Sequence, residues 1–391
     1  MENQSHLFGL DRDQVYLNCA TKGPALLAAK NAGIEGIETY SNPYNRSADD
    51  FFIHNVKLKR SFSKIIHCDD YERIAVIPSV SYGMTNVVNN IPFKKGDNIV
   101  IPDGQFPSNV YPWMAIAKEK NLELRIISAP DTFSNRAEKW NEKILDAIDE
   151  KTKVLAISNA FWSDGSLFDL RAMRKKTNKV NAFLIIDGTQ SVGAMHFSVE
   201  EIKPDALICA GYKWLLGPYS IGLAYYSSKF DQGMPIENNW MTRKDSNKFA
   251  QLVNYQEEYR PKAFKYSVGE SSHFILRPML QKALDQILDW GVENIQQYTE
   301  KISQSAIAEL RDLGIGIEED KFRSKHLFGL RLPKNIDAEK FSKELLSRKI
   351  HVAMRGDAVR VSPHVYNTKE DFEALTNALK SSLLTTVISN S

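Results

Sequence analysis

The chain has 391 residues, of which 43% are hydrophobic and 25% charged, as is typical of a globular protein. Its formal net charge is +2 at pH 7, and its basic residues are interleaved with acidic ones, which argues against a nucleic-acid partner because phosphate binding requires a clustered basic face. No apolar run approaches the roughly 20 residues that span a bilayer, and the start at 1–13 is too polar for a signal peptide, so we expect a cytoplasmic protein without a membrane partner.

Short apolar segments alternate with amphipathic helical patterns, which predicts a parallel sheet covered by helices on both faces. In chain order, the predicted strands lie at 73–77, 98–101, 123–127, 153–158, 183–187 and 206–210. Each strand ends in, or is directly followed by, a polar residue, a small residue or a proline where a loop should begin. Since such sheets bind ligands at the carboxyl ends of their strands, we expect the functional residues there.

The character of the sequence changes after about residue 272, where a long helical stretch at 279–313 leads into alternating strands and helices. A chain of this length exceeds one hydrophobic core, so we expect a large and a small domain. We predict an N-terminal segment 1–20 that packs on the small domain, a large domain 21–275 and a small α+β domain 276–391.

The three cysteines are Cys19, Cys68 and Cys209. Their number is odd and their spacing is not that of metal ligands. We therefore expect reduced thiols, with neither a disulfide framework nor a metal site.

Lys213 lies just past a predicted strand, in the segment CAGYKWLLGP at 209–218. Beside Tyr212 and Trp214 its amine can be partly desolvated, which lowers the pKa of the amine and makes it a nucleophile toward an aldehyde. Taken alone, this lysine is more readily interpreted as an ordinary surface residue of a loop.

Asp187 ends the predicted strand 183–187 and is followed by GTQSVGA. A carboxylate in this place can keep a pyridine nitrogen protonated, and that charge makes pyridoxal 5'-phosphate (PLP) an electron sink. It could also cap the next helix. One strand-helix-strand unit separates Asp187 from Lys213, so we expect the two side chains to face one pocket.

A phosphate site is predicted after the strand 73–77, where PSVSYG precedes a helical pattern. Free backbone amides at the start of a helix, together with the hydroxyl of Ser79 or Ser81, can bind a phosphate, although a plain helix cap would look the same. The phosphate site, the carboxylate and the lysine each follow a predicted strand. Their combination predicts a PLP site with a Schiff base on Lys213.

The sequence resembles the class V aminotransferases of PLP fold type I, which include cysteine desulfurases, selenocysteine lyases, kynureninases and isopenicillin-N epimerase-like enzymes. The resemblance extends from YLNCATKGP at 16–24 to RVSPHVYNTKEDFEAL at 360–375, and is most specific in IIDGTQSVGA and GYKWLLGP. It implies an α/β, aspartate aminotransferase-like fold with a mainly parallel sheet of the seven-stranded type, flanked by helices, plus a smaller α+β domain.

By this resemblance, Lys213 carries the cofactor, Asp187 holds the pyridine nitrogen and Gln190 approaches the ring hydroxyl. Further cofactor contacts are implied for Val80, Ser81 and Tyr212 at the phosphate, Phe106 stacked on the ring and Asn159 beside it. Glu270 stands where the family has a threonine that reaches the phosphate of the partner subunit, so either Ser271 takes over or the dimer contact differs.

Arg360 is the expected substrate-binding residue, because the family uses an arginine in this R-x-S context and a guanidinium pairs bidentately with an α-carboxylate. The alternative is an ion pair with a neighbouring carboxylate such as Asp357. Arg46, in NPYNRSADD, matches a family arginine close to the active site over a short stretch.

Departures from the family bear on the reaction. Desulfurases and selenocysteine lyases carry a cysteine just before the substrate arginine, whereas IHVAMRGDAVR at 350–360 contains none. Phe106 replaces their histidine, and Ala210 replaces a common phosphate-binding serine or threonine.

We therefore expect a PLP-dependent homodimeric enzyme, with active sites at the interface, that acts on an amino acid and favours transamination. In that reaction Lys213 moves the α-proton. The alternatives are a lyase or epimerase of the same family, and a PLP-fold binding protein without turnover.

Overall fold

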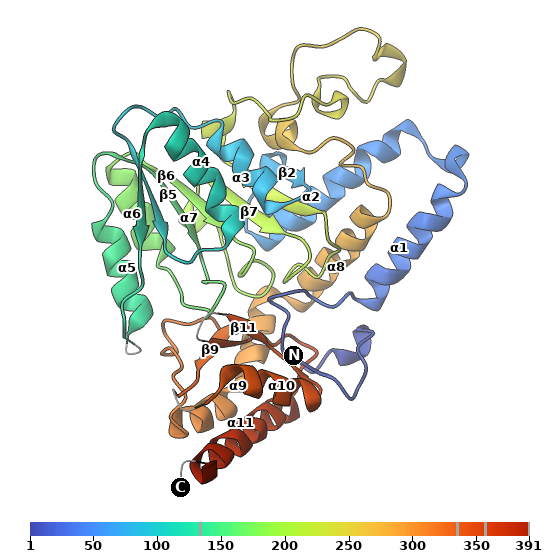
Figure 1. Cartoon of the computed structure of the whole chain (residues 1–391). Helices are drawn as coiled ribbons and strands as arrows, with labels where there is room; N and C mark the ends of the chain where they lie inside the picture. Colours follow the sequence, from blue (N-terminus) through green and yellow to red (C-terminus); the bar gives the residue numbers. More distant parts are fainter. Residues whose placement is uncertain (133–134, 334–335, 356–357, 390–391) are drawn as a thin grey trace.

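The computed structural model describes residues 1–132, 135–333, 336–355 and 358–389 (Figure 1). A seven-stranded sheet with the order β2-β8-β7-β6-β5-β3-β4 forms the centre of the larger part. Its strands are β2 (Ile74–Ile77), β3 (Asn98–Pro102), β4 (Glu123–Ile127), β5 (Thr152–Ser158), β6 (Phe183–Asp187), β7 (Ala206–Ala210) and β8 (Gly222–Tyr226). The six predicted strands are therefore confirmed.

Strand β8 was missed by the sequence analysis. It runs antiparallel to both of its neighbours, β2 and β7, whereas the other paired strands of the sheet are parallel. Antiparallel strands need no crossover helix, so the strand-helix alternation used for prediction did not indicate β8. The sheet remains mainly parallel, as expected.

Helices cover both faces of the sheet, which is why β6 and β7 are buried along their whole length and β5 is buried at all but one residue. Along β6, Leu184 and Ile186 belong to one hydrophobic cluster, and Phe183 and Ile185 belong to the other. The covering helices are α3 (Val80–Val88), α4 (Tyr111–Lys120), α5 (Arg136–Asp146), α6 (Leu170–Lys179) and the short α7 (Val199–Ile202). The sheet thus separates two apolar layers.

Three helices, α1 (Leu27–Tyr40), α2 (Ile53–Ile65) and α8 (Leu276–Trp290), pack together at one side of the sheet (Figure 1). The predicted single helical stretch at 279–313 is two helices, α8 and α9 (Val292–Asp312). They are separated by Gly291, whose φ of +76° is a conformation that glycine adopts without strain.

The C-terminal part contains a three-stranded antiparallel sheet of order β11-β12-β9, formed by β9 (Phe328–Arg331), β11 (Ala353–Arg355) and β12 (Ala358–Val361). Helices α9, α10 (Ala338–Ser347) and α11 (Lys369–Ser389) accompany it (Figure 1). None of the helices in the described ranges is both long and apolar enough to cross a membrane.

The N-terminal segment pairs with the C-terminal part. Strand β1 (Val15–Tyr16) lies parallel to β10 (Ile350–His351), and Asn18 forms a bridge with Ser362. Helix α8, by contrast, packs on α1 and α2. The division into 1–20, 21–275 and 276–391 stays a prediction. Helix α8 connects the larger part of the chain to the C-terminal part.

Candidate active site

A cleft of about 220 Å³ lies at the carboxyl ends of the parallel strands. Its lining comes from segments that follow β2, β3, β5, β6 and β7, and from the turn that precedes β8. The site residues that line it are Val80, Ser81, Phe106, Asp187, Gln190, Tyr212 and Lys213. Seven of the expected site residues are thus brought together around one cavity, where a parallel sheet is expected to bind its ligand.

Lys213 is buried, with 5% of its surface exposed, because it follows β7 directly into the interior. Its Nζ lies 5.0 Å from the ring centre of Phe106 and 5.7 Å from that of Tyr212. Burial lowers the pKa of this amine to about 8, although the charge of Asp187 acts in the opposite direction. A neutral amine is therefore available near neutral pH as a nucleophile or a base.

Asp187 is the last residue of β6, and its Oδ1 accepts a hydrogen bond from the backbone N–H of Thr189 at 3.0 Å. Burial raises the pKa of the carboxyl group, while Thr189 and the charge of Lys213 lower it. A ligand that brings a positive charge beside this carboxylate would stabilise its ionised form.

The amino end of α3 forms another wall of the cleft. The hydroxyl of Ser79 caps the helix by accepting from the N–H of Tyr82 at 3.2 Å, and it lies 3.0 Å from the hydroxyl of Ser81. Val80 and Ser81 are the first residues of the helix, so their N–H groups have no acceptor within it. This arrangement suits an anion such as phosphate.

Gln190 connects the cleft to its support. Its Nε2 donates to the carbonyl of Ala20 at 3.1 Å, and its Oε1 accepts from Nε1 of Trp214 at 2.8 Å. Its backbone carbonyl accepts from Nε2 of His326 at 2.7 Å, and burial lowers the pKa of this histidine to about 4. One amide hydrogen of Gln190 remains for a ligand. Its contact with a ring hydroxyl stays a prediction.

Arg360 lies on β12 with 1% of its surface exposed. Its Nη1 donates to the backbone oxygen of Trp162 at 2.9 Å, its Nη2 donates to the hydroxyl of Thr21 at 2.5 Å, and its Nε is buried without an acceptor. Burial, together with the neighbouring charge of Arg355, lowers the pKa of Arg360 to about 9.

Arg355 shares the same hydroxyl, since its Nη2 donates to Thr21 at 3.4 Å. Its guanidinium lies 5.7 Å from the ring centre of Trp162, a residue that lines the cleft. Within the described ranges, no carboxylate contributes to the pKa of either arginine. Asp357, the alternative partner for Arg360, lies outside the described residues.

Four predicted site residues are not part of the cleft lining, and one of them, Arg360, reaches the cleft through the backbone of Trp162. Asn159 is half-buried, but its neighbours Ser158 and Ala160 line the cleft in its place. Ser271 accepts from Nδ2 of Asn55 at 3.0 Å, in a separate small pocket. Arg46 stacks on Phe274, with its guanidinium carbon 3.6 Å from the ring centre, in a pocket that shares no residue with the cleft.

The sequence analysis missed the contribution of the N-terminal segment. Thr21 meets both arginines, and Gly23 lies against the lysine loop, where its N–H donates to the carbonyl of Tyr212 at 2.9 Å. A Cβ atom on Gly23 would stand 2.2 Å from the carbonyl oxygen of Lys213. The glycine in ATKGP was the available signal, because such a close approach of two backbones requires it.

The residues around the cleft fit PLP. Oγ of Ser158 and Oε1 of Gln105 are buried at its lining without a hydrogen-bond partner, as expected of a site that receives a polar ligand. The ring of Phe106 packs edge-on against Trp162, with centroids 5.5 Å apart. A helix terminus for the phosphate, an aromatic face, a buried carboxylate and a buried lysine form a matching set.

Comparisons with known proteins agree with this chemistry. A family model described as Aminotransferase class-V matches residues 45–375. An uncharacterized aminotransferase of Schizosaccharomyces pombe is 27% identical over 330 residues, covering 82% of this chain and 80% of the relative. A probable cysteine desulfurase of Methanothermobacter thermautotrophicus is 24% identical and covers 94% of each chain. A solved structure of a C-DES mutant, with glycine covalently linked to its PLP cofactor, has a TM-score of 0.85 at 17% identity and covers 96% of this chain and 98% of that one.

Proposed function

Because the chain belongs to the class-V aminotransferase family, with PLP fold type I and PLP as its cofactor, we propose that it is an aminotransferase. Its substrate would be an α-amino acid, which binds in the cleft around Lys213 and gives up its amino group there. One observation carries the proposal: a buried lysine of lowered pKa and a buried carboxylate follow adjacent strands and line the same cavity. Such pairs with opposed pKa shifts are typical of sites that move protons.

When bound, PLP supplies an aldehyde for the amino group and an electron sink for the charge that develops on the substrate α-carbon. The chain would hold it at four places. The amides of Val80 and Ser81 would take the phosphate, the ring of Phe106 would cover one face, Asp187 would pair with the pyridine nitrogen, and Lys213 would be the covalent attachment.

Lys213 also moves the proton in this proposal. With a substrate in the cleft, Nζ of Lys213 would take the proton from the substrate α-carbon as a base and would hold it for return within the site. The pKa of about 8 makes an appreciable fraction of this amine neutral near physiological pH. Its burial keeps bulk water away from the transferred proton.

Arg360 would bind the α-carboxylate. Its buried Nε lacks an acceptor, and Thr21 and the carbonyl of Trp162 fix the plane of the guanidinium. A carboxylate would supply the missing acceptor and offset the burial of the charge, which supports an amino acid over a simple amine as substrate.

Sulfur transfer is a weaker reading, although several relatives are named as probable cysteine desulfurases. A sulfur acceptor needs an accessible thiolate, whereas all three cysteines are buried. Burial raises the pKa of Cys19 to about 12 and that of Cys68 to about 11, and it raises the pKa of Cys209 as well. A lyase or epimerase reaction that needs no thiol is the remaining alternative.

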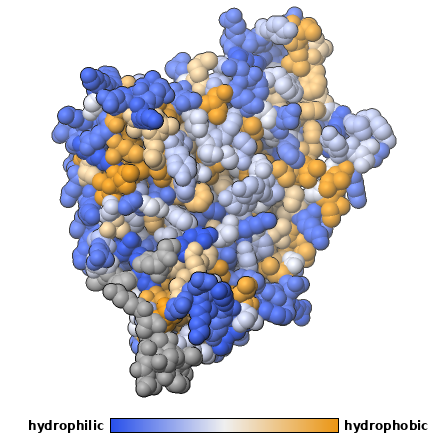
Figure 2. Space-filling model, viewed as in Figure 1, coloured by the Kyte–Doolittle hydropathy of each residue, from blue (hydrophilic) through white to orange (hydrophobic). Residues whose placement is uncertain are grey.

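We further propose a closed homodimer. Apolar side chains are exposed on α1 and the loop after it, with Ile37 at 55%, Tyr40 at 68% and Tyr44 at 80%. Figure 2 shows hydrophobic residues at the edge of the molecule formed by α1. Arg46 and Ser271 lie outside the cleft of their own chain, and in a two-fold dimer they would serve the partner. Full activity of a monomer in sedimentation experiments would contradict this.

The cytoplasm is the proposed location, on the ground of the cysteines alone. Cys19, Cys68 and Cys209 are free in the structure, and unpaired thiols are the rule in reducing compartments. Fractionation of cells with an antibody against the chain would test this.

The test of the reaction is a panel of α-amino acids added to the holoenzyme, with loss of the bound-cofactor absorbance and product identity as readouts. We expect one or more amino acids to yield the matching keto acid and to leave the cofactor in its aminated form. Formation of pyruvate with ammonia, or of the D-isomer, would assign the lyase or the epimerase alternative. No spectral change with any amino acid would support a binding protein without turnover.

A further inference from the structure

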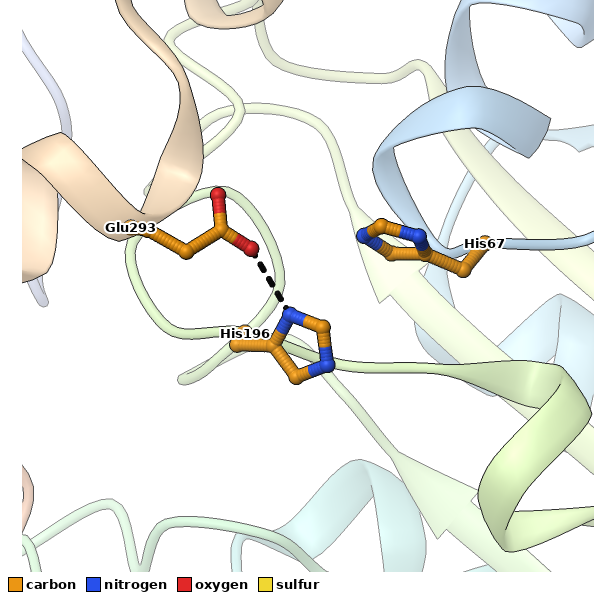
Figure 3. Close-up of side chains that lie close together, drawn as sticks. All are labelled: His67, His196 and Glu293. Atoms are coloured by element: carbon orange, nitrogen blue, oxygen red, sulfur yellow. Dashed lines mark hydrogen bonds and ion pairs between the residues drawn. The ribbon is translucent and has the colours of Figure 1, made fainter.

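His67, His196 and Glu293 come together at the surface from three separate parts of the chain (Figure 3). One possible ligand atom from each residue lies within 4.8 Å of those of the other two, and none of the three lines the cleft. The sequence analysis expected no metal site, because residues this far apart in the chain form no recognisable spacing. The fold creates the cluster.

Each of these residues is held by a different element. His67 follows α2 with a φ of +46°, and its N–H donates to the carbonyl of Lys64. His196 lies between β6 and α7, and its N–H donates to the side chain of Gln296 at 3.3 Å. Glu293 stands in the first turn of α9. The segment that carries His196 is thus bound to α9 through Gln296, and Val199 donates to the carbonyl of Ile66 next to His67, so the three backbones are held together and only the side chains need to adjust to a ligand.

Nδ1 of His196 and Oε1 of Glu293 are 2.8 Å apart, and the ring of His67 stands 4.9 Å from that of His196 (Figure 3). Two imidazoles and one carboxylate are a donor set that zinc accepts in proteins, with a water in the fourth position.

The possible ligand atoms of the three side chains need to move only slightly closer together to bind an ion. Donors around a tetrahedral zinc ion, with bonds of about 2.1 Å, stand about 3.4 Å apart. The side chains of His196 and Glu293 are 41% and 56% exposed, so they can rotate toward an ion without disturbing the core. Nε2 of His196 also lies 3.9 Å from Oε1 of a second carboxylate, Glu201, whose other oxygen is paired with Arg171.

We propose that His67, His196 and Glu293 bind one divalent transition-metal ion of the zinc type. Binding displaces the proton shared by His196 and Glu293 to solvent, and no electron transfer is involved. The ion would tie the end of α2 and the start of α9 to the segment after β6. The segment after β6 also carries Gln190, which lines the cleft. The ion would therefore stabilise this segment against the start of α9. The site does not depend on the reaction proposed for the cleft.

The test uses untagged holoenzyme, stripped of metal with a chelator and titrated with zinc chloride in a calorimeter. We expect one zinc ion per chain that is absent from His67→Ala and His196→Ala, together with a melting temperature that zinc raises in the wild type but not in these two variants. Glu293→Gln, which retains a hydrogen-bond acceptor for His196 but lacks the charge, should bind at least about 10-fold more weakly. His6→Ala, which removes another exposed histidine, is the matched control and should bind like the wild type.

Wild-type protein that takes up no zinc would overturn the proposal, as would equal affinity in the wild type and the three cluster variants. In the latter case zinc would be bound at thiols or at the cofactor phosphate. Lys213→Ala separates the two proposals, because it should retain zinc binding whether or not the reaction assigned to the cleft is correct.

Discussion

Asp187 and Lys213 stand after adjacent parallel strands, β6 and β7, and both side chains line one cleft. Burial shifts their pKa values in opposite directions, raising that of the carboxyl group and lowering that of the amine to about 8. Their mutual attraction opposes both shifts. A cofactor that bonds to the amine and pairs its own positive charge with the carboxylate would satisfy both groups at once.

Replacement of Asp187 by Asn removes the charge and retains the size. The variant should still bind PLP, since the lysine and the helix terminus remain. Proton removal from the substrate should slow by at least about 100-fold, because the ring nitrogen is no longer held protonated. Single-turnover measurements with a reactive amino acid check this. A variant that keeps most of the wild-type rate would reduce Asp187 to a cap of the following segment.

Arg360→Lys retains the charge but loses the planar fork of donors. If Arg360 binds the α-carboxylate, kcat/KM should fall about 30-fold to 1000-fold, which corresponds to roughly 2 to 4 kcal/mol. The loss should be confined to substrates with a carboxylate next to the amine, and PLP binding should not change. An equal loss with the decarboxylated amine would show that Arg360 only supports the contacts with Thr21 and Trp162.

The lowered pKa of Lys213 predicts how apoenzyme takes up its cofactor. Only the neutral amine attacks an aldehyde, so the rate of covalent PLP attachment should rise with pH through about 8 and then level off. The rate is measured by stopped-flow absorbance between pH 6.5 and 9.5. A rate that keeps rising toward the ordinary lysine pKa of about 10.4 would mean that the amine is not desolvated.

His364 predicts a loss of stability in acid. Burial lowers its pKa to about 3, so between that value and the ordinary histidine pKa of about 6.5 the unfolded chain binds a proton that the folded chain does not. Stability is complete above pH 6.5 and falls as the pH drops, by roughly 1.4 kcal/mol per pH unit, which is about 2 kcal/mol at pH 5.

His364→Phe tests this directly. Both ring nitrogens of His364 lack hydrogen-bond partners, and its ring stacks with Trp214 and Tyr366, so phenylalanine retains the packing. Urea unfolding at pH 7.5 and pH 5 should show a smaller acid loss in the variant than in the wild type. The same difference in both proteins would assign the acid sensitivity to other groups.

Much of the fold followed from local pattern. Five of the six predicted strands are mainly apolar runs, as strands buried between two helical layers must be, whereas 123–127 is a partly exposed edge strand with charged residues. The break at Gly291 was missed because an apolar helical pattern continues on both sides of it, and only the positive φ reveals the turn. No helix precedes strand β8, so the alternation of strands and helices did not predict it.

Some residues of the site were likewise predictable from the sequence, and others were not. Lys213, Asp187 and the start of α3 were predictable, since each follows a strand and the carboxyl ends of parallel strands meet at one edge. Thr21 and Arg355 were not, because the contact between them joins distant parts of the chain and depends on how β1 meets β10. No local pattern records that pairing.

The central claim is that PLP is covalently attached to Lys213, and reduction of the holoenzyme with borohydride followed by peptide mapping tests it most directly. A pyridoxyl label is expected on the peptide that contains Lys213, and no label is expected in Lys213→Ala. This variant should remain folded because a lysine side chain adds little to the packing of this loop. A label on another lysine of the wild type, or turnover by a folded Lys213→Ala variant, would contradict it.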